Sequence, residues 1–299
     1  MILLTWASDL VALAHQPYNM IICLCRRPRD HQEAQMTDPG SGEVRLERHG
    51  HIAHLVIDRP AKLNAMTVAM DHRMNELVFE INNDQNIRVV VLYGTGDRAF
   101  SAGSDITDLD EYGDNWSYRN RFDNRTDYAR AIWLLRKPAV AAVHGYCIGG
   151  GLEMASACDI RLASPDASFG AGEIRWGWHG GSGQTQYLTH LVGPGSASKI
   201  LLTGERIDAA EAHRIGLVQE LVERDELLER AAAIAESIAE KSPIATQRTK
   251  YMVRVAQNVG IDAALHIEND SFSYLMKTED AAEGQAAFAE KRAPVFTGR

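Results

Sequence analysis

The sequence predicts an α/β fold. Short apolar runs typical of buried strands alternate with amphipathic helical patterns, and loops of small residues follow the buried strands. With 299 residues, of which 45% are hydrophobic, the chain is long enough to bury a sizeable core. One domain with a helical appendage and two full domains are both compatible with this length.

The first elements are a hairpin and a helix. Residues 44–48 and 51–57 alternate roughly between polar and apolar side chains on either side of His49-Gly50, which predicts a β-hairpin. From Thr67, apolar residues recur at helical spacing and predict an amphipathic helix. Its buried face is expected to carry Met70, Met74, Leu77, Val78 and Ile81.

Two further strand-plus-helix units follow. Continuous apolar runs at residues 89–93 and 139–143 predict buried strands, and residues 160–163 predict a shorter strand. Beyond about Gly204 the pattern turns helical. Helices are expected at residues 209–213 and 227–240, and from about Ala245 onward.

Residues 1–35 differ from the rest of the chain. Met1 to Cys25 is moderately apolar but is interrupted by Asp9 and His15 and lacks an early basic region, so it predicts neither a signal peptide nor a membrane span. Met36 precedes the first strand. We therefore divide the chain into an extension at 1–35, disordered or not translated, a core at 36–203 that holds the active site, and a helical region at 204–299. Deletion to Met36 is expected to leave folding and turnover intact.

The charge and the cysteine content limit the kinds of ligand and partner that the chain is expected to bind. A net charge of -9 argues against a general affinity for nucleic acid or for an anionic membrane, because either needs clustered Lys and Arg. A small phosphorylated ligand needs only a few local cations. The four cysteines show neither metal-site spacing nor a disulfide framework. Cys147 and Cys158 are most simply small buried residues in a reducing cytosol, so we expect a cytoplasmic protein without a metal.

Two glycine-rich loops and two carboxylates indicate where chemistry could occur. Cys147-Ile148-Gly149-Gly150-Gly151-Leu152-Glu153 follows the run at 139–143. If a helix opens near Gly151, its unpaired amides can stabilise a negatively charged oxygen. The segment 97–106 leaves the strand at 89–93 and can supply a second amide, while Glu173 adds the second carboxylate. A tight strand-to-helix connection with no chemistry is the alternative reading of the glycines alone.

Together with Asp58-Arg59-Pro60-Ala61-Lys62-Leu63-Asn64-Ala65 and Ala286-Ala287-Phe288-Ala289-Glu290-Lys291-Arg292, these motifs stand in an order that resembles the crotonase superfamily, the enoyl-CoA hydratase/isomerase group. The resemblance runs from about Val44 to the C-terminus. It implies a spiral of ββα units, followed by C-terminal helices that pack trimers, which pair into hexamers. It also implies an enoyl-CoA hydratase of fatty acid β-oxidation, which adds water across the 2,3 double bond of an acyl-CoA substrate. Coenzyme A is then part of the substrate, and no separate cofactor is needed.

The resemblance assigns roles to four residues. The backbone N–H groups of Ser104 and Gly150 would form the oxyanion hole, Glu153 would activate water, and Glu173 would supply a proton to the α-carbon. Simpler readings stay open for three of them. Ser104 could close a turn, Glu153 could be an acid favoured by the helix dipole, and Glu173 could be an ordinary surface acid.

Coenzyme A would lie along backbone and side chains from three loops, by the same resemblance. These residues are Ala61, Lys62, Leu63, Ala102, Asp105, Ile106 and Gly149. Lys62 could equally be a solvated surface lysine. The C-terminal Lys291 and Arg292 could contact phosphate or form structural salt bridges.

The sequence departs from the family after Glu173. Gly180 stands where many hydratases have proline, and the bulky Trp176 and Trp178 are expected to shape the acyl end of the pocket. The polar, aromatic stretch at 107–130 is lid-like. His179 could be a third acid/base group or a hydrogen-bonded structural histidine.

Other reactions fit the same motifs. Double-bond isomerisation and thioester hydrolysis use the same oxyanion hole, so they are the nearest alternatives to hydration. A member of the family that binds RNA or protein without catalysis is a further alternative. The carboxylate pair and the acidic charge disfavour it.

Overall fold

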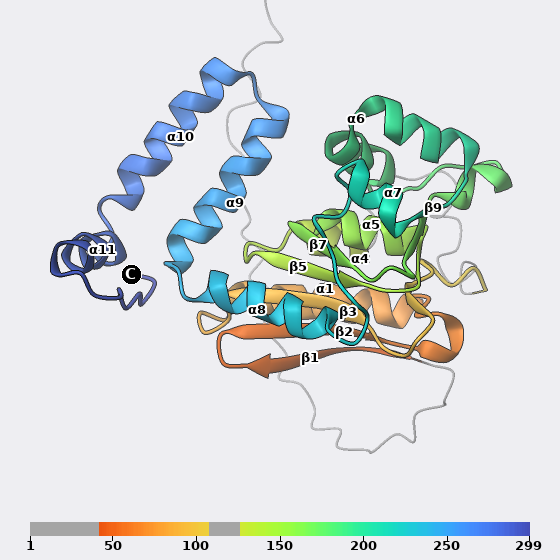
Figure 1. Ribbon diagram of the computed structural model, residues 1–299, viewed down its shortest axis with the longest axis horizontal. Coiled ribbons are helices and arrows are strands. Elements are labelled where there is room, and N and C mark those ends of the chain that lie inside the picture. The colour runs from red at the N-terminus through yellow and green to blue at the C-terminus, as the bar shows by residue number, and fades with distance from the viewer. Residues whose placement is uncertain (1–41, 108–125) are drawn as a thin grey trace, which may run out of the picture. The chain divides into compact units, whose positions relative to one another are not determined.

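The computed structural model describes residues 42–107 and 126–299. All of them lie in one of the two units into which the chain divides, Asp38–Arg299. The predicted extension at 1–35 and most of the lid-like stretch, including Tyr112 and Trp116, lie outside the described residues. The domain boundaries at 35 and 203 stay predictions. The fold is α/β as predicted, with two sheets and a set of C-terminal helices (Figure 1).

The larger sheet has six strands, and all but the first edge strand are parallel to their neighbours. In sheet order they are β1 (Glu43–His49), β2 (Ile52–Asp58), β3 (Val89–Gly94), β5 (Ala139–Val143), β7 (Ile160–Ala163) and β10 (Glu220–Leu221). The hairpin of β1 and β2 is confirmed, with His49 opposite Ile52. Gly50 has φ +61°, which suits this tight turn because glycine adopts positive φ at little cost.

The smaller sheet has four short strands. In sheet order they are β4 (Ala99–Ser101), β6 (Tyr146–Ile148), β8 (Ser168–Gly170) and β9 (Ile207–Asp208). The first three are parallel, and β9 is antiparallel to β8. The chain passes repeatedly from the larger sheet to the smaller one, as β3 to β4, β5 to β6 and β7 to β8. This repetition confirms the spiral of strand pairs and helices.

The helix α1 (Val68–Asn83) forms where the apolar spacing predicts it. The side chain of Thr67 caps it by accepting a hydrogen bond from the Met70 amide, which satisfies one of the free N–H groups of the first turn. All five apolar residues expected on its inner face are buried. The expected face therefore packs into the core.

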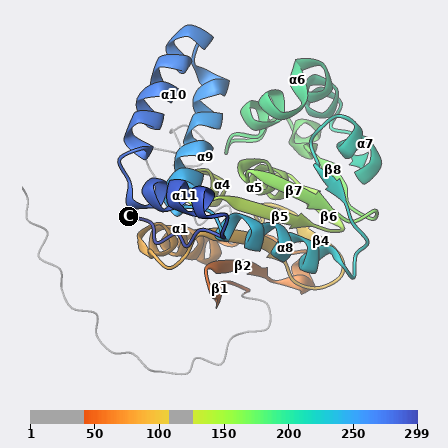
Figure 2. The same ribbon diagram turned by 60° about the vertical axis from the view of Figure 1, so that its left-hand side comes forward.

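The larger sheet is covered on both faces, which explains its continuous apolar strands. Val90 and Leu92 of β3 belong to a core shared with α1, α4 (Tyr128–Trp133) and α5 (Gly150–Ala157). Val89 and Val91 point to the opposite face and pack with α8 (Leu227–Ala239). Figure 2 shows α5 and α8 on opposite sides of β5 and β7.

The region after residue 204 is mostly helical, as expected, but it also contributes a strand to each sheet. Its helices are α7 (Ala209–Arg214), α8, α9 (Pro243–Asn258), α10 (Ile261–Leu275) and α11 (Glu279–Glu290). The strands β9 and β10 have two residues each, too few for periodicity to reveal them. The helix α9 starts two residues earlier than expected, because Ser242 caps it and Pro243 fits its first position.

Polar contacts fasten α9 to the core. Lys250 is buried, and its Nζ lies 2.7 Å from Asp159 Oδ2 and 2.8 Å from the carbonyl oxygen of Lys137. The guanidinium of Arg254 lies 3.9 Å from the centre of the Trp133 ring. Among the described residues, no helix is long and apolar enough to cross a membrane.

Candidate active site

Three neighbouring parallel strands of the smaller sheet deliver three of the predicted site residues. Ser104 follows β4, Gly150 follows β6, and Glu173 follows β8. Because β4, β6 and β8 are adjacent and parallel, their carboxyl ends meet at one edge of the sheet. The topology therefore gathers residues that are far apart in the sequence.

The two glycine-rich loops are in direct contact. Gly103 has φ +87°, and a Cβ atom there would lie 2.5 Å from the backbone nitrogen of Gly150, so no other residue fits. Gly150 is equally confined, because its Cβ would lie 1.9 Å from the hydroxyl oxygen of Tyr128. The glycines allow this close approach of the two backbones.

Ser104 is held by backbone and side-chain bonds. Met66 donates to the carbonyl of Gly103 (2.7 Å) and accepts from the amide of Asp105 (2.8 Å). In this parallel bridge the amide of Ser104 itself points away from Met66. The Ser104 Oγ and the Tyr128 hydroxyl form a 2.7 Å hydrogen bond, so Tyr128 contacts both loops.

Helix α5 begins at Gly150, one residue before the predicted start, after Gly149 with φ +57°. The amides of its first turn have no partner within the helix and so are suited to hold an anion. The structure thus brings Ser104 and Gly150 together, as the oxyanion-hole hypothesis requires. Their role as donors stays a prediction.

Glu153 stands in the first turn of α5 and is buried, with 3% of its surface exposed. Its Oε1 accepts hydrogen bonds from the amides of Ser182 (2.8 Å) and Gln184 (3.4 Å). These bonds satisfy one oxygen of the buried carboxylate. An acid favoured only by the helix dipole needs neither burial nor these two donors, so the structure gives Glu153 more partners than that interpretation requires.

Glu173 lies in the 3₁₀ helix η3 (Gly172–Trp176), and its Oε1 accepts from Gln184 Nε2 at 3.1 Å. Burial raises the pKa of Glu173, and hydrogen bonds from its own backbone and from Gln184 offset the increase only in part. A Cβ atom on Gly149 would lie 3.1 Å from the same Oε1, so Glu173 faces the start of α5. A raised pKa suits a proton donor.

The loop expected to hold coenzyme A adjoins the loop after β4. Ala61 and Lys62 are exposed in the 3₁₀ helix η1 (Pro60–Lys62), and the carbonyl of Leu63 accepts from the amide of Ala102 at 2.9 Å. This bond joins two of the predicted binding segments. Lys62 could contact coenzyme A or could be a solvated surface lysine, and the binding roles of this loop stay predictions.

The Asp105 carboxylate is held by the protein itself. Its Oδ2 lies 2.6 Å from Arg59 Nη1, and its Oδ1 accepts from the amide (3.0 Å) and hydroxyl (2.7 Å) of Thr107. Burial alone would raise its pKa, but the bonds from Thr107 and Arg59 outweigh burial and lower the pKa to about 2. The ion pair therefore fixes the backbone next to Ser104.

Three apolar side chains expected near the substrate are exposed. The exposed fractions are 74% for Ile106, 73% for Trp176 and 50% for Trp178. His179 is exposed as well, and its Nδ1 contacts the carbonyl of Gly180 at 2.7 Å. Arg292 forms salt bridges with Glu283 and Glu290, in line with the structural alternative for this residue.

Sequence reasoning missed four residues that support the site: Asp127, Tyr128, Ser182 and Gln184. Ser182 Oγ donates to Asp127 Oδ2 at 2.5 Å while the Ser182 amide holds Glu153. Ser182 and Gln184 follow Gly180, whose departure from the family pattern is the only signal in the sequence that points to this turn. Asp127 and Tyr128 reach the site through the tertiary fold, which no local pattern indicates.

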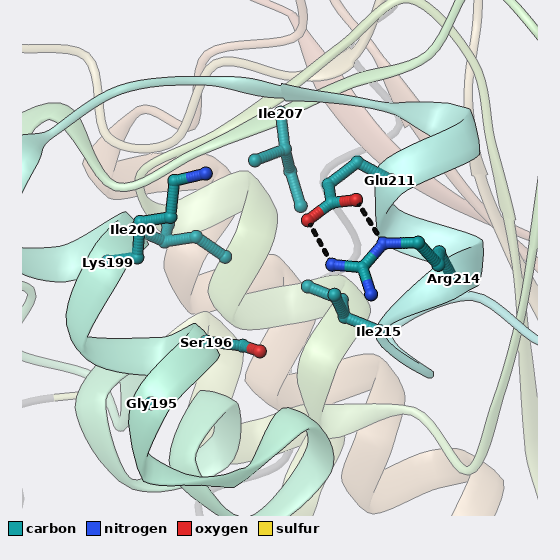
Figure 3. Close-up of a pocket in the computed structure, with 8 residues that line it drawn as sticks. All are labelled: Gly195, Ser196, Lys199, Ile200, Ile207, Glu211, Arg214 and Ile215. Atoms are coloured by element: carbon teal, nitrogen blue, oxygen red, sulfur yellow. Dashed lines mark hydrogen bonds and ion pairs between the residues drawn. The ribbon is translucent and has the colours of Figure 1, made fainter.

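A separate cavity of about 260 Å³ lies between α6 (Gln184–Thr203) and α7. Figure 3 shows Lys199 and Ser196 of α6 on one side, and the Glu211–Arg214 ion pair of α7 on the other. None of the predicted site residues lines it. It is therefore distinct from the carboxylate pair.

Comparison with known proteins shows the family of the chain. Residues 47–299 match the model of the family described as enoyl-CoA hydratase/isomerase. The short-chain-enoyl-CoA hydratase of Clostridium acetobutylicum is 38% identical over 255 residues, which are 83% of this chain and 95% of that protein. The 2,3-dehydroadipyl-CoA hydratase of Escherichia coli K12 is 38% identical over 86% of this chain and 99% of its own length.

A solved structure shows the same fold. The crystal structure of enoyl-CoA hydratase from Bacillus anthracis superposes with a TM-score of 0.80 at 32% identity, covering 86% of this chain and 99% of that one. The chain belongs to the enoyl-CoA hydratase/isomerase, or crotonase, family. Among its relatives, the (E)-benzylidenesuccinyl-CoA hydratase of Thauera aromatica is 35% identical over 85% of this chain and 99% of its own length.

The Arg59–Asp105 pair makes stability depend on pH. The folded pKa of Asp105 lies below its ordinary value of 3.8, so the ionised carboxylate stabilises the fold above about pH 4, and this contribution is lost as pH falls towards 2. We expect Asp105→Asn to lower the free energy of unfolding by about 2 kcal/mol at pH 7. Denaturant unfolding at pH 7, 4 and 2.5 should show the difference from wild type shrinking with pH.

The matched control is Asp97→Asn, since Asp97 is an exposed aspartate before the same loop. Its substitution should change the free energy of unfolding by less than about 0.5 kcal/mol. A difference between wild type and Asp105→Asn that stays constant down to pH 2.5 would contradict the expectation.

Proposed function

We propose that this protein is an enoyl-CoA hydratase, which adds water across the 2,3 double bond of an enoyl-CoA thioester. The observation that carries the proposal is the pair of glutamates in unlike surroundings. Backbone amides hold the Glu153 carboxylate, whereas burial raises the pKa of Glu173. Hydration needs one group that accepts a proton and one that donates a proton, and unlike surroundings divide these roles.

The enolate that forms during hydration needs stabilisation at the thioester oxygen. The amides of Ser104 and Gly150 are suited to this, because the two loops that carry them are in contact and held rigidly. One such donor typically contributes about 3 kcal/mol to transition-state stabilisation. Because the donors are backbone groups, side-chain substitutions nearby should leave them in place.

The proton transfers follow from the carboxylates. Glu153 would take a proton from water as the water oxygen attacks the β-carbon, and Glu173 would give its proton to the α-carbon. Each product atom is then accounted for: the water supplies the hydroxyl, and the proton left on Glu153 returns to Glu173 through solvent. The family resemblance and the raised pKa of Glu173 support this division of roles.

The names of the relatives indicate which acyl groups the substrate could carry. Their names include a short-chain enoyl-CoA, a dehydroadipyl-CoA and a benzylidenesuccinyl-CoA, so the family scaffold accepts aliphatic, dicarboxylic and aromatic acyl groups. We propose that Trp176 and Trp178, close in sequence to Glu173, select among these. Fatty acid β-oxidation is the pathway that the resemblance implies.

We also propose that the chain assembles as a homotrimer or as a hexamer of two trimers. Large apolar side chains of α9 and α10 are more than a third exposed: Tyr251, Val253, Ile261, Leu265, Ile267, Phe272 and Tyr274. Contiguous exposed apolar surface commonly marks a contact between proteins. The buried free thiols of Cys147 and Cys158 support a reducing cytoplasmic location.

Loss of the ultraviolet absorbance of crotonyl-CoA and longer enoyl-CoAs tests the proposed reaction, because hydration removes the conjugated double bond. Product analysis distinguishes the alternatives. A 3-hydroxyacyl-CoA supports hydration, a shifted double bond indicates an isomerase, and free coenzyme A indicates a hydrolase. Lack of turnover with every thioester would favour the binding-only alternative.

The two carboxylates are expected to act as one unit. Glu153→Gln and Glu173→Gln each keep shape but remove a proton-transfer partner, so each should lower hydration turnover by about 10² to 10⁴ fold. The double variant should fall far short of the product of the two effects, because groups acting in one step are not additive. Steady-state rates and product binding measure this, and binding should survive.

Glu205→Gln is the control, because Glu205 is an exposed acid that is not among the predicted site residues. It should keep wild-type turnover. Near-normal hydration by Glu153→Gln would remove Glu153 from the mechanism. Loss of activity in Glu173→Gln alone would instead favour an isomerase with one base.

Trp178 is expected to set acyl specificity. Removing its indole in Trp178→Ala should shift the preferred acyl length or ring content, since the ring fills space or stacks on flat groups, while affinity for coenzyme A stays nearly unchanged. Turnover of a panel of enoyl-CoAs measures the profile. Phe79→Ala, at an exposed position on α1, is the control. An unchanged profile in Trp178→Ala would contradict the role.

Assembly is expected to show in the molar mass. Sedimentation should give three or six times the chain mass of 33.0 kDa. Leu265→Asp places a charge on the exposed apolar face of α10 and should shift the protein to smaller species, because a buried unpaired charge is costly. A wild-type protein that sediments as a monomer at micromolar concentration would refute the assembly.

A further inference from the structure

Gln184 hydrogen-bonds to both glutamates of the site. Its backbone amide lies 3.4 Å from Glu153 Oε1, and its side-chain Nε2 lies 3.1 Å from Glu173 Oε1. Nε2 also lies 3.3 Å from the carbonyl oxygen of Gly149, at the start of α5. The residue is 1% exposed, so these contacts are shielded from water.

The two oxygens of Glu173 are unlike because of Gln184. Glu173 Oε1 accepts a hydrogen bond from Gln184 Nε2, and this nitrogen can only donate. A proton on Oε1 would therefore point at another hydrogen and could not form a hydrogen bond with Nε2. Oε2 is buried, and no described residue hydrogen-bonds to it. A neutral carboxyl group therefore places its proton on Oε2 with the least conflict.

We propose that Gln184 is a positioning residue that orients Glu173 and makes Oε2 the oxygen that carries the transferable proton. The inference rests on the proposed hydration, and it adds a residue that orients the carboxyl group of Glu173. The bond that breaks is O–H at Glu173 Oε2, and the bond that forms is C–H at the α-carbon. The electron pair of the O–H bond stays on the carboxylate, which Gln184 continues to hold through Oε1.

Gly180 gives independent support. A Cβ atom at position 180 would lie 2.5 Å from Gln184 Oε1 and 2.6 Å from Gln184 Cβ, which is too close for either group to stay in place. Gly180 is also the position where many hydratases of the resembled family carry proline. The departure at 180 thus leaves the space that the Gln184 side chain occupies, so the two residues form a coupled pair.

The first experiment compares Gln184→Met with wild type. Methionine has similar length but no amide donor, so kcat should fall at least about 10-fold as Glu173 loses its orientation. Loss of the donor also removes a bond that lowers the pKa of Glu173. The protonated acid should therefore persist to higher pH, and the basic limb of the kcat profile should move up by about half a pH unit or more.

Two measurements separate this role from a structural one. Gln186→Met changes an exposed glutamine on the same helix and should leave kcat and the pH profile unchanged. Product affinity of Gln184→Met should stay within about two-fold of wild type, because the backbone donors are intact. A simple loss of folding would lower both quantities without moving the pH limb.

The second experiment is a double-mutant cycle at positions 180 and 184. Gly180→Ala should lower kcat about 10-fold in the wild-type background, because the new Cβ displaces Gln184. In a Gln184→Gly background the space is open, so the same change should lower kcat by less than about two-fold. Unequal effects of this kind are the signature of two residues in contact.

The outcomes separate the inference from the proposed function. If wild type fails to hydrate any enoyl-CoA, the proposed function is wrong. If wild type is active but Gln184→Met keeps its kcat and its basic limb, the positioning role is wrong. Equal effects of Gly180→Ala in both backgrounds would overturn the coupling of the two positions.

Discussion

The parallel alignment of β4, β6 and β8 is the constraint on which the site depends. Each of these strands has only three residues, yet their carboxyl ends lie side by side and release the loops that carry Ser104, Gly150 and Glu173. The larger sheet, buried on both faces, supplies the strand that precedes each of them in the chain. The position of the chemistry therefore derives from the packing of residues that take no part in it.

Much of this arrangement could be predicted from the sequence, because its signals are local. The apolar runs of β3 and β5 and the helical spacing in α1 predicted buried elements, and the three glycines at 149–151 predicted a close approach of backbones. What could not be predicted depends on distant partners. The strands β9 and β10 exist because of pairing with β8 and β7, and the support of Glu153 by Ser182 crosses 29 positions of the chain.

The pKa values of carboxyl groups in the site depend on burial and on the positions of hydrogen-bond donors. The amides of Ser182, just before α6, and of Gln184, its first residue, face Glu153. Glu173 is buried, and one of its oxygens accepts from the side-chain amide of Gln184. Asp105 shows the opposite outcome, because Arg59 and Thr107 overcome the effect of burial. Asp105 and Glu173 thus have opposite protonation tendencies, and the sequence, which shows only their identity, could not indicate this.

The contact between Gly103 and Gly150 has an evolutionary consequence. Main-chain groups carry no side-chain identity, so mutation of neighbouring side chains can change the surroundings of this contact while the contact itself persists. Variation is then free to accumulate at exposed side chains near these loops, such as Trp176 and Trp178. A lineage built on such a scaffold can exchange the side chains around the two loops one at a time, without passing through an ancestor in which the two backbones have moved apart.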